Sequence, residues 1–114
     1  MLTKIQTLER QIEQVKKQLL ALGEMRPGSL SRQKRNRGGL YHQLSYRHTG
    51  KSRTEYVRPE LVSMVRGHID TYREFRRLSE RWTTLAIELC KLQMEQEKEN
   101  PNTQRQRGEE LTPG

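Results

Sequence analysis

The side chains with the clearest chemistry are arginines and lysines concentrated in one segment. Residues 26–58 hold nine basic side chains against one acid, Glu55, so the segment carries a net charge of +8. The remaining residues hold 13 basic and 13 acidic side chains and are neutral overall. Like charges at this density repel one another, so the segment predicts an anionic ligand that compensates them. The nine basic residues are Arg26, Arg32, Lys34, Arg35, Arg37, Arg47, Lys51, Arg53 and Arg58.

Phosphate groups are the anions that fit these side chains best. Seven of the nine are arginines, whose guanidinium forks match phosphate oxygens and base edges. Each phosphate contact also releases a condensed counterion, which favours binding. We therefore predict a nucleic-acid-binding site made of these nine residues, with an acidic protein partner or a solvated loop over 32–39 as the alternatives. The sequence does not separate DNA binding from RNA binding, or single strands from duplexes.

Three tyrosines, Tyr41, Tyr46 and Tyr56, alternate with the basic residues. Exposed tyrosine rings stack on bases, and buried ones pack against a neighbouring helix. We expect packing for at least two of the three.

Catalytic and metal-binding patterns are missing from the sequence. Its histidines, His42, His48 and His68, have no second cysteine beside Cys90 with which to form a metal site, and Gly50 does not begin a phosphate-binding loop. The chain is therefore predicted to be no enzyme and to use no metal, no cofactor and no small-molecule substrate.

Two apolar stripes predict the helices. Each advances by steps of 3-4-3-4-3 residues, which is a coiled-coil heptad pattern. Thr3 and Gln6 form a capping box at the first stripe, and Pro59 suits the first position of a second helix. We predict helices over 3–23 and 59–96, paired as an antiparallel hairpin, or alternatively pairing only between chains. The seam, which would also serve a dimer or partner, is Ile5, Leu8, Ile12, Val15, Leu19, Leu22, Phe75, Leu78, Trp82, Leu85, Leu89 and Leu92.

The segment between these helices, 24–58, is predicted to be a basic loop followed by a small β-hairpin. Leu44 and Tyr46 share one strand face, Thr49 and Gly50 supply the turn, and the hairpin packs on the second helix. The fold class is thus mainly α: a coiled-coil-like antiparallel helical hairpin with a basic loop and small β-hairpin inserted at its tip. We expect one domain over 1–96 and a disordered tail over 97–114.

Several short motifs resemble a known family. Residues 25–31 (MRPGSLS) are followed in order by 41–46, 50–54, 56–57 and 72–76. Together, over about residues 20–95, they resemble a family of small uncharacterised bacterial and archaeal proteins often encoded near transposases. Family members commonly carry a small cysteine cluster between the first motif and the first strand, and this chain has no cysteine there. The resemblance therefore implies a cysteine-cluster-lacking, transposon-associated variant and carries over neither metal binding nor an activity.

These observations predict a soluble, cytoplasmic, basic protein that binds DNA or RNA without catalysis. It would be an accessory protein of a mobile element or of a transposase or nuclease complex. Its helical stem would form a homodimer or dock on that larger protein, and it would not bind membranes. The rival interpretation is an adaptor or inhibitor that binds a larger enzyme through the stem and the basic segment. A purely structural spacer and a ribonucleoprotein subunit are further alternatives.

Overall fold

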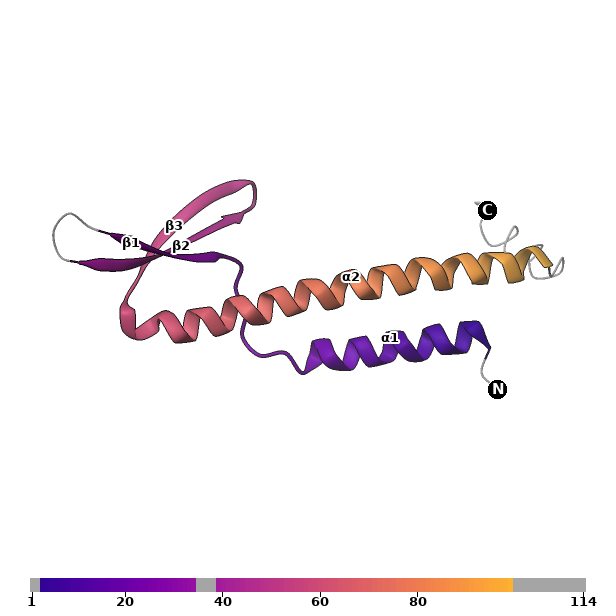
Figure 1. Ribbon diagram of the computed structural model, residues 1–114. Helices are drawn as coiled ribbons and strands as arrows, with labels where there is room; N and C mark the ends of the chain where they lie inside the picture. The colour runs from indigo at the N-terminus through magenta and orange to yellow at the C-terminus, as the bar shows by residue number, and fades with distance from the viewer. Residues whose placement is uncertain (1–2, 35–38, 100–114) are drawn as a thin grey trace, which may run out of the picture. The chain divides into compact units, whose positions relative to one another are not determined.

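A computed structural model describes residues 3–34 and 39–99. These residues divide into two compact units. The helical unit comprises 1–18 and 79–114, of which 3–18 and 79–99 are described, and the sheet unit comprises 19–78. The elements in chain order are α1 (Lys4–Leu20), β1 (Ser29–Lys34), β2 (Leu40–His48), β3 (Lys51–Val57), a 3-10 turn (Pro59–Leu61) and α2 (Val62–Glu99) (Figure 1).

Helix α1 begins at the predicted capping box. The Thr3 hydroxyl oxygen accepts a hydrogen bond from the Gln6 backbone N–H at 3.1 Å, and the Gln6 side chain accepts one from the Thr3 N–H at 3.0 Å. These reciprocal bonds satisfy two backbone donors that have no partner inside the helix. The helix ends at Leu20, three residues before the predicted end at Gly23.

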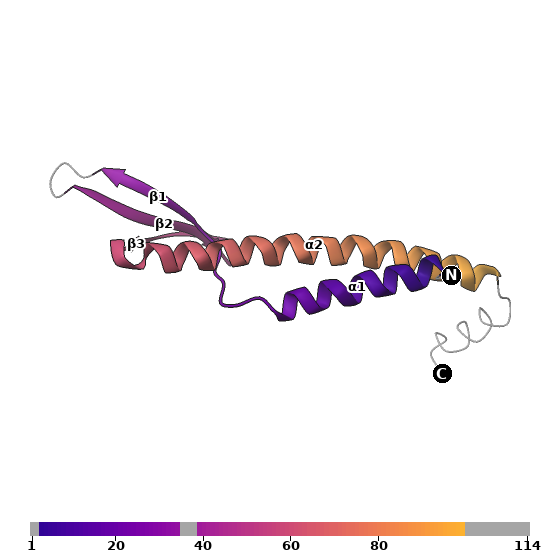
Figure 2. The same cartoon turned by 60° about the horizontal axis from the view of Figure 1, so that its bottom comes forward.

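Within the helical unit, α1 lies alongside the C-terminal half of α2 (Figures 1 and 2). The Lys4 ammonium lies 3.9 Å from the Glu88 carboxylate, and the Lys16 ammonium lies 5.3 Å from the centre of the Trp82 ring. The N-terminus of α1 therefore lies nearer the C-terminus of α2 than the rest of α1 does, so the two helices are antiparallel. Their apolar stripe is buried in the unit at Leu8, Ile12, Val15 and Leu85.

The sheet unit is built on a three-stranded antiparallel sheet of order β1-β2-β3. The predicted turn between β2 and β3 is confirmed at Thr49 and Gly50, which both have positive φ (51° and 80°), as a two-residue hairpin turn with a right-handed twist requires. The N-terminal half of α2 packs on one face of the sheet, where Leu44 and Val57 meet Val65 and Ile69.

The predicted fold class is wrong in its architecture. A mainly α helical hairpin with a small two-stranded hairpin was expected, and the chain instead combines one short and one long helix with a three-stranded sheet. The missing strand is β1, which lies where a basic loop was predicted. Its sequence, SLSRQK, has only Leu30 as an apolar residue, so it lacks the alternation that identifies a strand.

The second predicted helix starts as a 3-10 turn with Pro59 in its first turn and continues as α2 to Glu99. Residues 97–99 of the predicted tail therefore belong to α2, and the rest of that tail lies outside the described residues. No helix in the described part of the chain is long and apolar enough to cross a membrane.

Candidate nucleic-acid interface

The strand register assigns each side chain of the sheet to one of two faces, because directly opposed residues of antiparallel strands point to the same side. Leu44 of β2 is opposed by Leu30 of β1 and Glu55 of β3. This inner face packs on α2 and includes the fully buried Leu44 side chain. The residues that alternate with these along each strand point to the outer face, away from α2.

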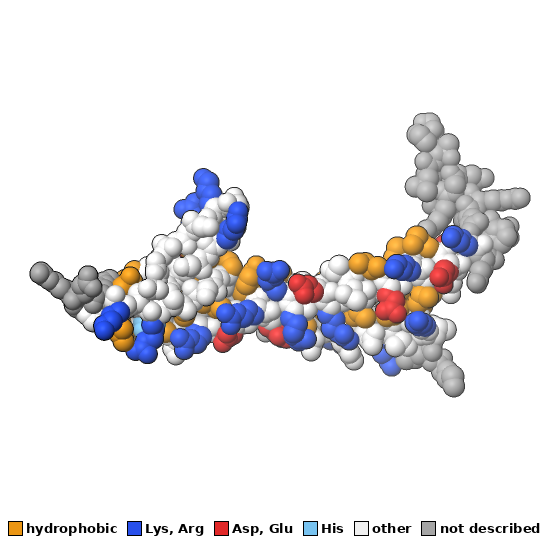
Figure 3. Space-filling view, turned by 45° about the horizontal axis from the view of Figure 1, so that its top comes forward, with side chains coloured by type: hydrophobic (Ala, Val, Ile, Leu, Met, Phe, Trp, Pro, Cys, Tyr) orange, Lys and Arg blue, Asp and Glu red, His pale blue; other side chains and the backbone are white. Residues whose placement is uncertain are grey.

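The predicted basic residues fall into three groups in the sheet unit. Arg32 and Lys34 are exposed on β1, an edge strand, and Arg58 is exposed just before the 3-10 turn. The other exposed members surround the turn between β2 and β3, and Figure 3 shows Lys and Arg side chains gathered at the free end of that hairpin. These members are Arg47, Lys51 and Arg53. The remaining predicted residues, Arg35 and Arg37, lie outside the described residues.

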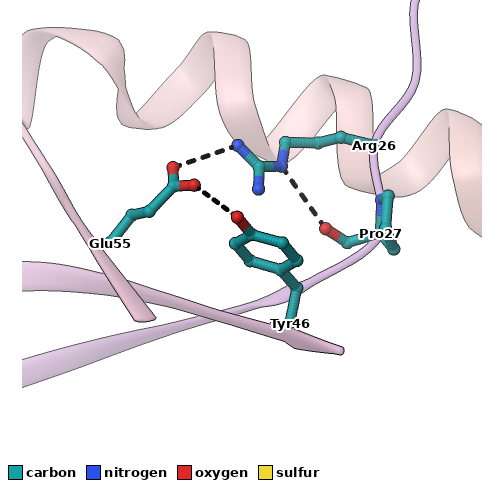
Figure 4. Close-up of polar contacts among 4 residues, drawn as sticks. All are labelled: Arg26, Pro27, Tyr46 and Glu55. Carbon is teal, nitrogen blue, oxygen red and sulfur yellow. Dashed lines mark hydrogen bonds and ion pairs between the residues drawn. The ribbon is translucent and has the colours of Figure 1, made fainter. Parts of the chain in front are cut away.

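Arg26 differs from the other predicted basic residues because its half-buried side chain contacts other residues of the sheet unit (Figure 4). Its guanidinium lies 4.7 Å from the centre of the Tyr46 ring and 3.4 Å from the Glu55 carboxylate. Its backbone N–H donates a hydrogen bond to the His68 carbonyl of α2 at 3.1 Å. We call Arg26, Tyr46 and Glu55 the Arg26 cluster, which ties the MRPGSLS segment to the inner face of the sheet.

The Arg26 cluster shifts the pKa values of its two acidic groups in opposite directions. The hydrogen bond that the Tyr46 hydroxyl donates to Glu55 lowers the pKa of the Glu55 carboxyl, and the Arg26 charge lowers it further. The same hydrogen bond raises the pKa of the Tyr46 phenol. The cluster therefore holds the one acid of the basic segment in its ionised form and pairs it internally.

Six basic side chains of the segment remain available to a ligand, and we call them the basic set. Among residues that the structure describes, none of the six has a carboxylate within 4.0 Å. Burying part of such a surface against phosphates would remove like-charge repulsion as well as release counterions. The basic set is Arg32, Lys34, Arg47, Lys51, Arg53 and Arg58.

The two units differ in net charge. The sheet unit carries 13 basic and 5 acidic residues, a net charge of +8, and the helical unit carries 9 of each. The whole net charge of the chain therefore belongs to the unit that contains the sheet.

Two further arginines of the sheet unit were not predicted as site residues. Arg66 and Arg73 of α2 line a hollow of about 150 Å³ together with Ser29 of β1. Arg73 also lies 3.8 Å from the Asp70 carboxylate, so part of its charge is already compensated. Both residues belong to a helix whose contact with β1 was not expected, because β1 itself was not predicted.

The tyrosines do not follow the expectation that at least two of them pack on the second helix. Tyr46 packs against the inner-face core. Tyr41 and Tyr56 lie on the outer face, with ring centres 6.1 Å apart and ring planes inclined by 38°. Tyr56 is 55% exposed and Tyr41 is half-buried.

Within residues 3–34 and 39–99, no group of three or more His, Cys, Asp or Glu residues is placed to hold a metal ion. The predicted seam residues are distributed over both units, because Leu19, Leu22, Phe75 and Leu78 belong to the sheet unit. Leu78 is buried there, whereas Phe75 is 36% exposed.

Residues 5–67 match the model of a protein family described as a domain of unknown function (DUF6788). The match covers more than half of the chain and runs from α1 through the sheet into the first turns of α2. No curated protein and no solved structure is significantly similar to the chain.

Proposed function

The chain belongs to the DUF6788 family, and from its own residues we propose that it is a non-catalytic nucleic-acid-binding accessory protein. The basic set grips the phosphate backbone, and the helical unit joins the protein to a partner. The observation that carries the proposal is that six exposed cations of a unit with net charge +8 have no carboxylate within 4.0 Å among the described residues, although the charge of Arg53 reaches Glu55.

The Arg26 cluster supports this proposal because it pairs the one acid of the basic segment. It removes the segment's only acid, Glu55, from competition with a ligand by pairing it with Arg26. Arg26 then serves to hold the sheet unit together, and phosphate binding falls to the basic set. A mobile element, with a transposase or nuclease as the larger partner, is the context that the MRPGSLS resemblance favours.

The helical unit carries a surface suited to a protein partner. Trp82, Ala86, Ile87 and Cys90 line a hollow of about 450 Å³ on α2, together with Ser79 and Thr83. Ile87 is 53% exposed, while Leu85 of the stripe buried in the unit is only 6% exposed. We assign this hollow to a second copy of the chain, because the helical unit is neutral overall and uncharged side chains line the hollow.

The second candidate function is an adaptor that binds a larger enzyme through both units, in which the hollow would receive that enzyme instead of a second copy. The two candidates differ in what the basic set contacts. An adaptor would bind one protein tightly and would have no affinity for free DNA or RNA at physiological salt.

A pair of matched triple variants tests the proposal. R47A/K51A/R53A removes three charges from the basic set, and K17A/K91A/K98A removes three exposed charges from the helical unit. We expect the first variant to bind labelled DNA or RNA of random sequence more weakly than the wild type, and the second to bind like the wild type. Equal affinities for both variants and the wild type would contradict the proposal.

A further inference from the structure

The outer face of the sheet consists mostly of uncharged polar side chains. Among its described residues, Arg47 is the only charged one, and all the others are hydroxyl, amide or phenol side chains. The face has no aliphatic side chain, so it does not resemble a surface that packs on a helix. Its members are Ser29, Ser31, Gln33, Tyr41, Gln43, Ser45, Arg47, Ser52, Thr54 and Tyr56.

We infer that this outer face binds the unpaired bases of a single-stranded nucleic acid. The inference rests on the proposed function, because Arg47, the basic-set residue on this face, would hold a phosphate of the same strand. Arg32, Lys34, Lys51 and Arg53 point to the other face of the sheet, and would hold phosphates where the strand passes its edge and its hairpin end. It names the class of ligand, which the positive charge alone leaves open.

Two tyrosine rings lie close together on the outer face. Tyr41 comes from β2 and Tyr56 from β3, and the register places them diagonally, since Tyr56 is opposed by Gln43. Tyr56 is 55% exposed, so part of its side chain is accessible to a ligand on this face of the sheet. The flat face of a base covers such a ring, and this stacking tolerates any sequence.

Amide and hydroxyl side chains surround the two tyrosines on the outer face. The amides of Gln33 and Gln43 and the hydroxyls of Ser31 and Ser45 can donate and accept hydrogen bonds, as base edges also do. Gln33 already donates a 3.0 Å hydrogen bond to Ser31, which orders both side chains on the surface. Neutral donors and acceptors beside aromatic rings match bases rather than phosphates.

A duplex does not offer what this face can bind. The base faces are stacked inside a duplex, and a flat sheet reaches chiefly its phosphates. A neutral polymer would cover the tyrosines but would leave the +8 charge of the sheet unit uncompensated. A single strand supplies both phosphates and free base faces.

The test compares a labelled oligothymidine strand with a hairpin duplex of mixed sequence, using fluorescence anisotropy at fixed salt. We expect the wild type to prefer the single strand. Y41L/Y56L should bind that strand about tenfold or more weakly and bind the duplex as the wild type does, because leucine offers no ring on which a base can stack. Y41F/Y56F keeps both rings and should retain most of the affinity. Tyr56→Leu alone, at the more exposed position, gives a second variant whose melting temperature should match that of the wild type.

The outcomes separate this inference from the proposed function. Salt-dependent binding in which Y41L/Y56L and Tyr56→Leu, both folded, hold the single strand as tightly as the wild type would overturn the inference and leave the proposed function standing. Absence of binding to either nucleic acid at low salt would overturn both.

Discussion

The Tyr46 hydroxyl donates a 2.7 Å hydrogen bond to the Glu55 carboxylate across neighbouring strands of the sheet. The Arg26 guanidinium lies over the same tyrosine ring and beside the same carboxylate. One arginine from the MRPGSLS segment is thereby fixed to two strands that lie far from it in the sequence. The arrangement explains why a basic residue of this segment contributes to the structure of the sheet unit rather than to ligand binding.

The Arg26 cluster predicts a specific pH dependence of stability. Glu55 has a folded-state pKa below its ordinary value of 4.5, so its contribution is present above pH 4.5 and is lost as the pH falls through the folded value. The pKa of Tyr46 is raised above 10.0, so its contribution is present below pH 10.0 and is lost as the pH rises through the folded value. We expect Tyr46→Phe to lower the free energy of unfolding near neutral pH and to weaken its dependence on pH at both extremes.

Urea denaturation between pH 3 and pH 7 measures the acidic limb, and ultraviolet difference titration follows the tyrosines at high pH. The matched control is Tyr72→Phe on α2, since Tyr72 contacts Phe75 and lies outside the cluster. Identical pH profiles for Tyr46→Phe and the wild type would show that the hydrogen bond to Glu55 does not contribute to stability.

Gly28 of the MRPGSLS segment is predicted to tolerate no side chain. Its φ is +149°, and a Cβ atom there would lie 2.5 Å from Cδ1 of Leu44, the most deeply buried residue of the sheet. We expect Gly28→Ala to reduce the free energy of unfolding by roughly 2–4 kcal/mol, from backbone strain and overpacking together. Gly23→Ala is the control, because nothing lies within 4 Å of a Cβ atom at that position. Equal melting temperatures for the two variants would rule out this role for Gly28.

The sequence identified some of these features and missed others for physical reasons. The capping box at Thr3 and Gln6 and the turn at Thr49 and Gly50 depend on neighbouring residues only, and both were predicted and are present. Strand β1 was missed because its polar sequence becomes a strand only through pairing with β2 and through the packing of its Leu30 side chain on the core. Local propensity carries no sign of that tertiary contact.

The charge of the candidate site could be predicted from the sequence, but the arrangement of its side chains could not. The concentration of charge in one segment was visible in the sequence, and the register now assigns each residue to a face. The pairing of Arg26 with Glu55 joins residues that are 29 positions apart, so no local pattern reveals it. The outer position of Tyr41 and Tyr56 likewise depends on a strand register that the sequence did not fix.

Self-association through the hollow on α2 is a further prediction. Ile87→Glu places a charge on an exposed apolar residue of that hollow and should weaken or abolish dimer formation, because an unpaired charge at a buried interface is unfavourable. Thr84→Glu adds the same charge at an exposed α2 position that does not line the hollow, and should leave the dimer intact. Analytical ultracentrifugation of the three proteins distinguishes these results. A monomeric wild type at high concentration would contradict the assignment of the hollow to a second copy.

The salt dependence of nucleic-acid binding tests the central proposal most directly. We expect the logarithm of the association constant to fall linearly with the logarithm of salt concentration, since each phosphate contact releases a counterion. R47A/K51A/R53A should reduce the magnitude of that slope by roughly 2–3, and K17A/K91A/K98A should leave it unchanged. Absence of binding at low salt, or a slope that the first variant does not alter, would contradict phosphate binding by the basic set.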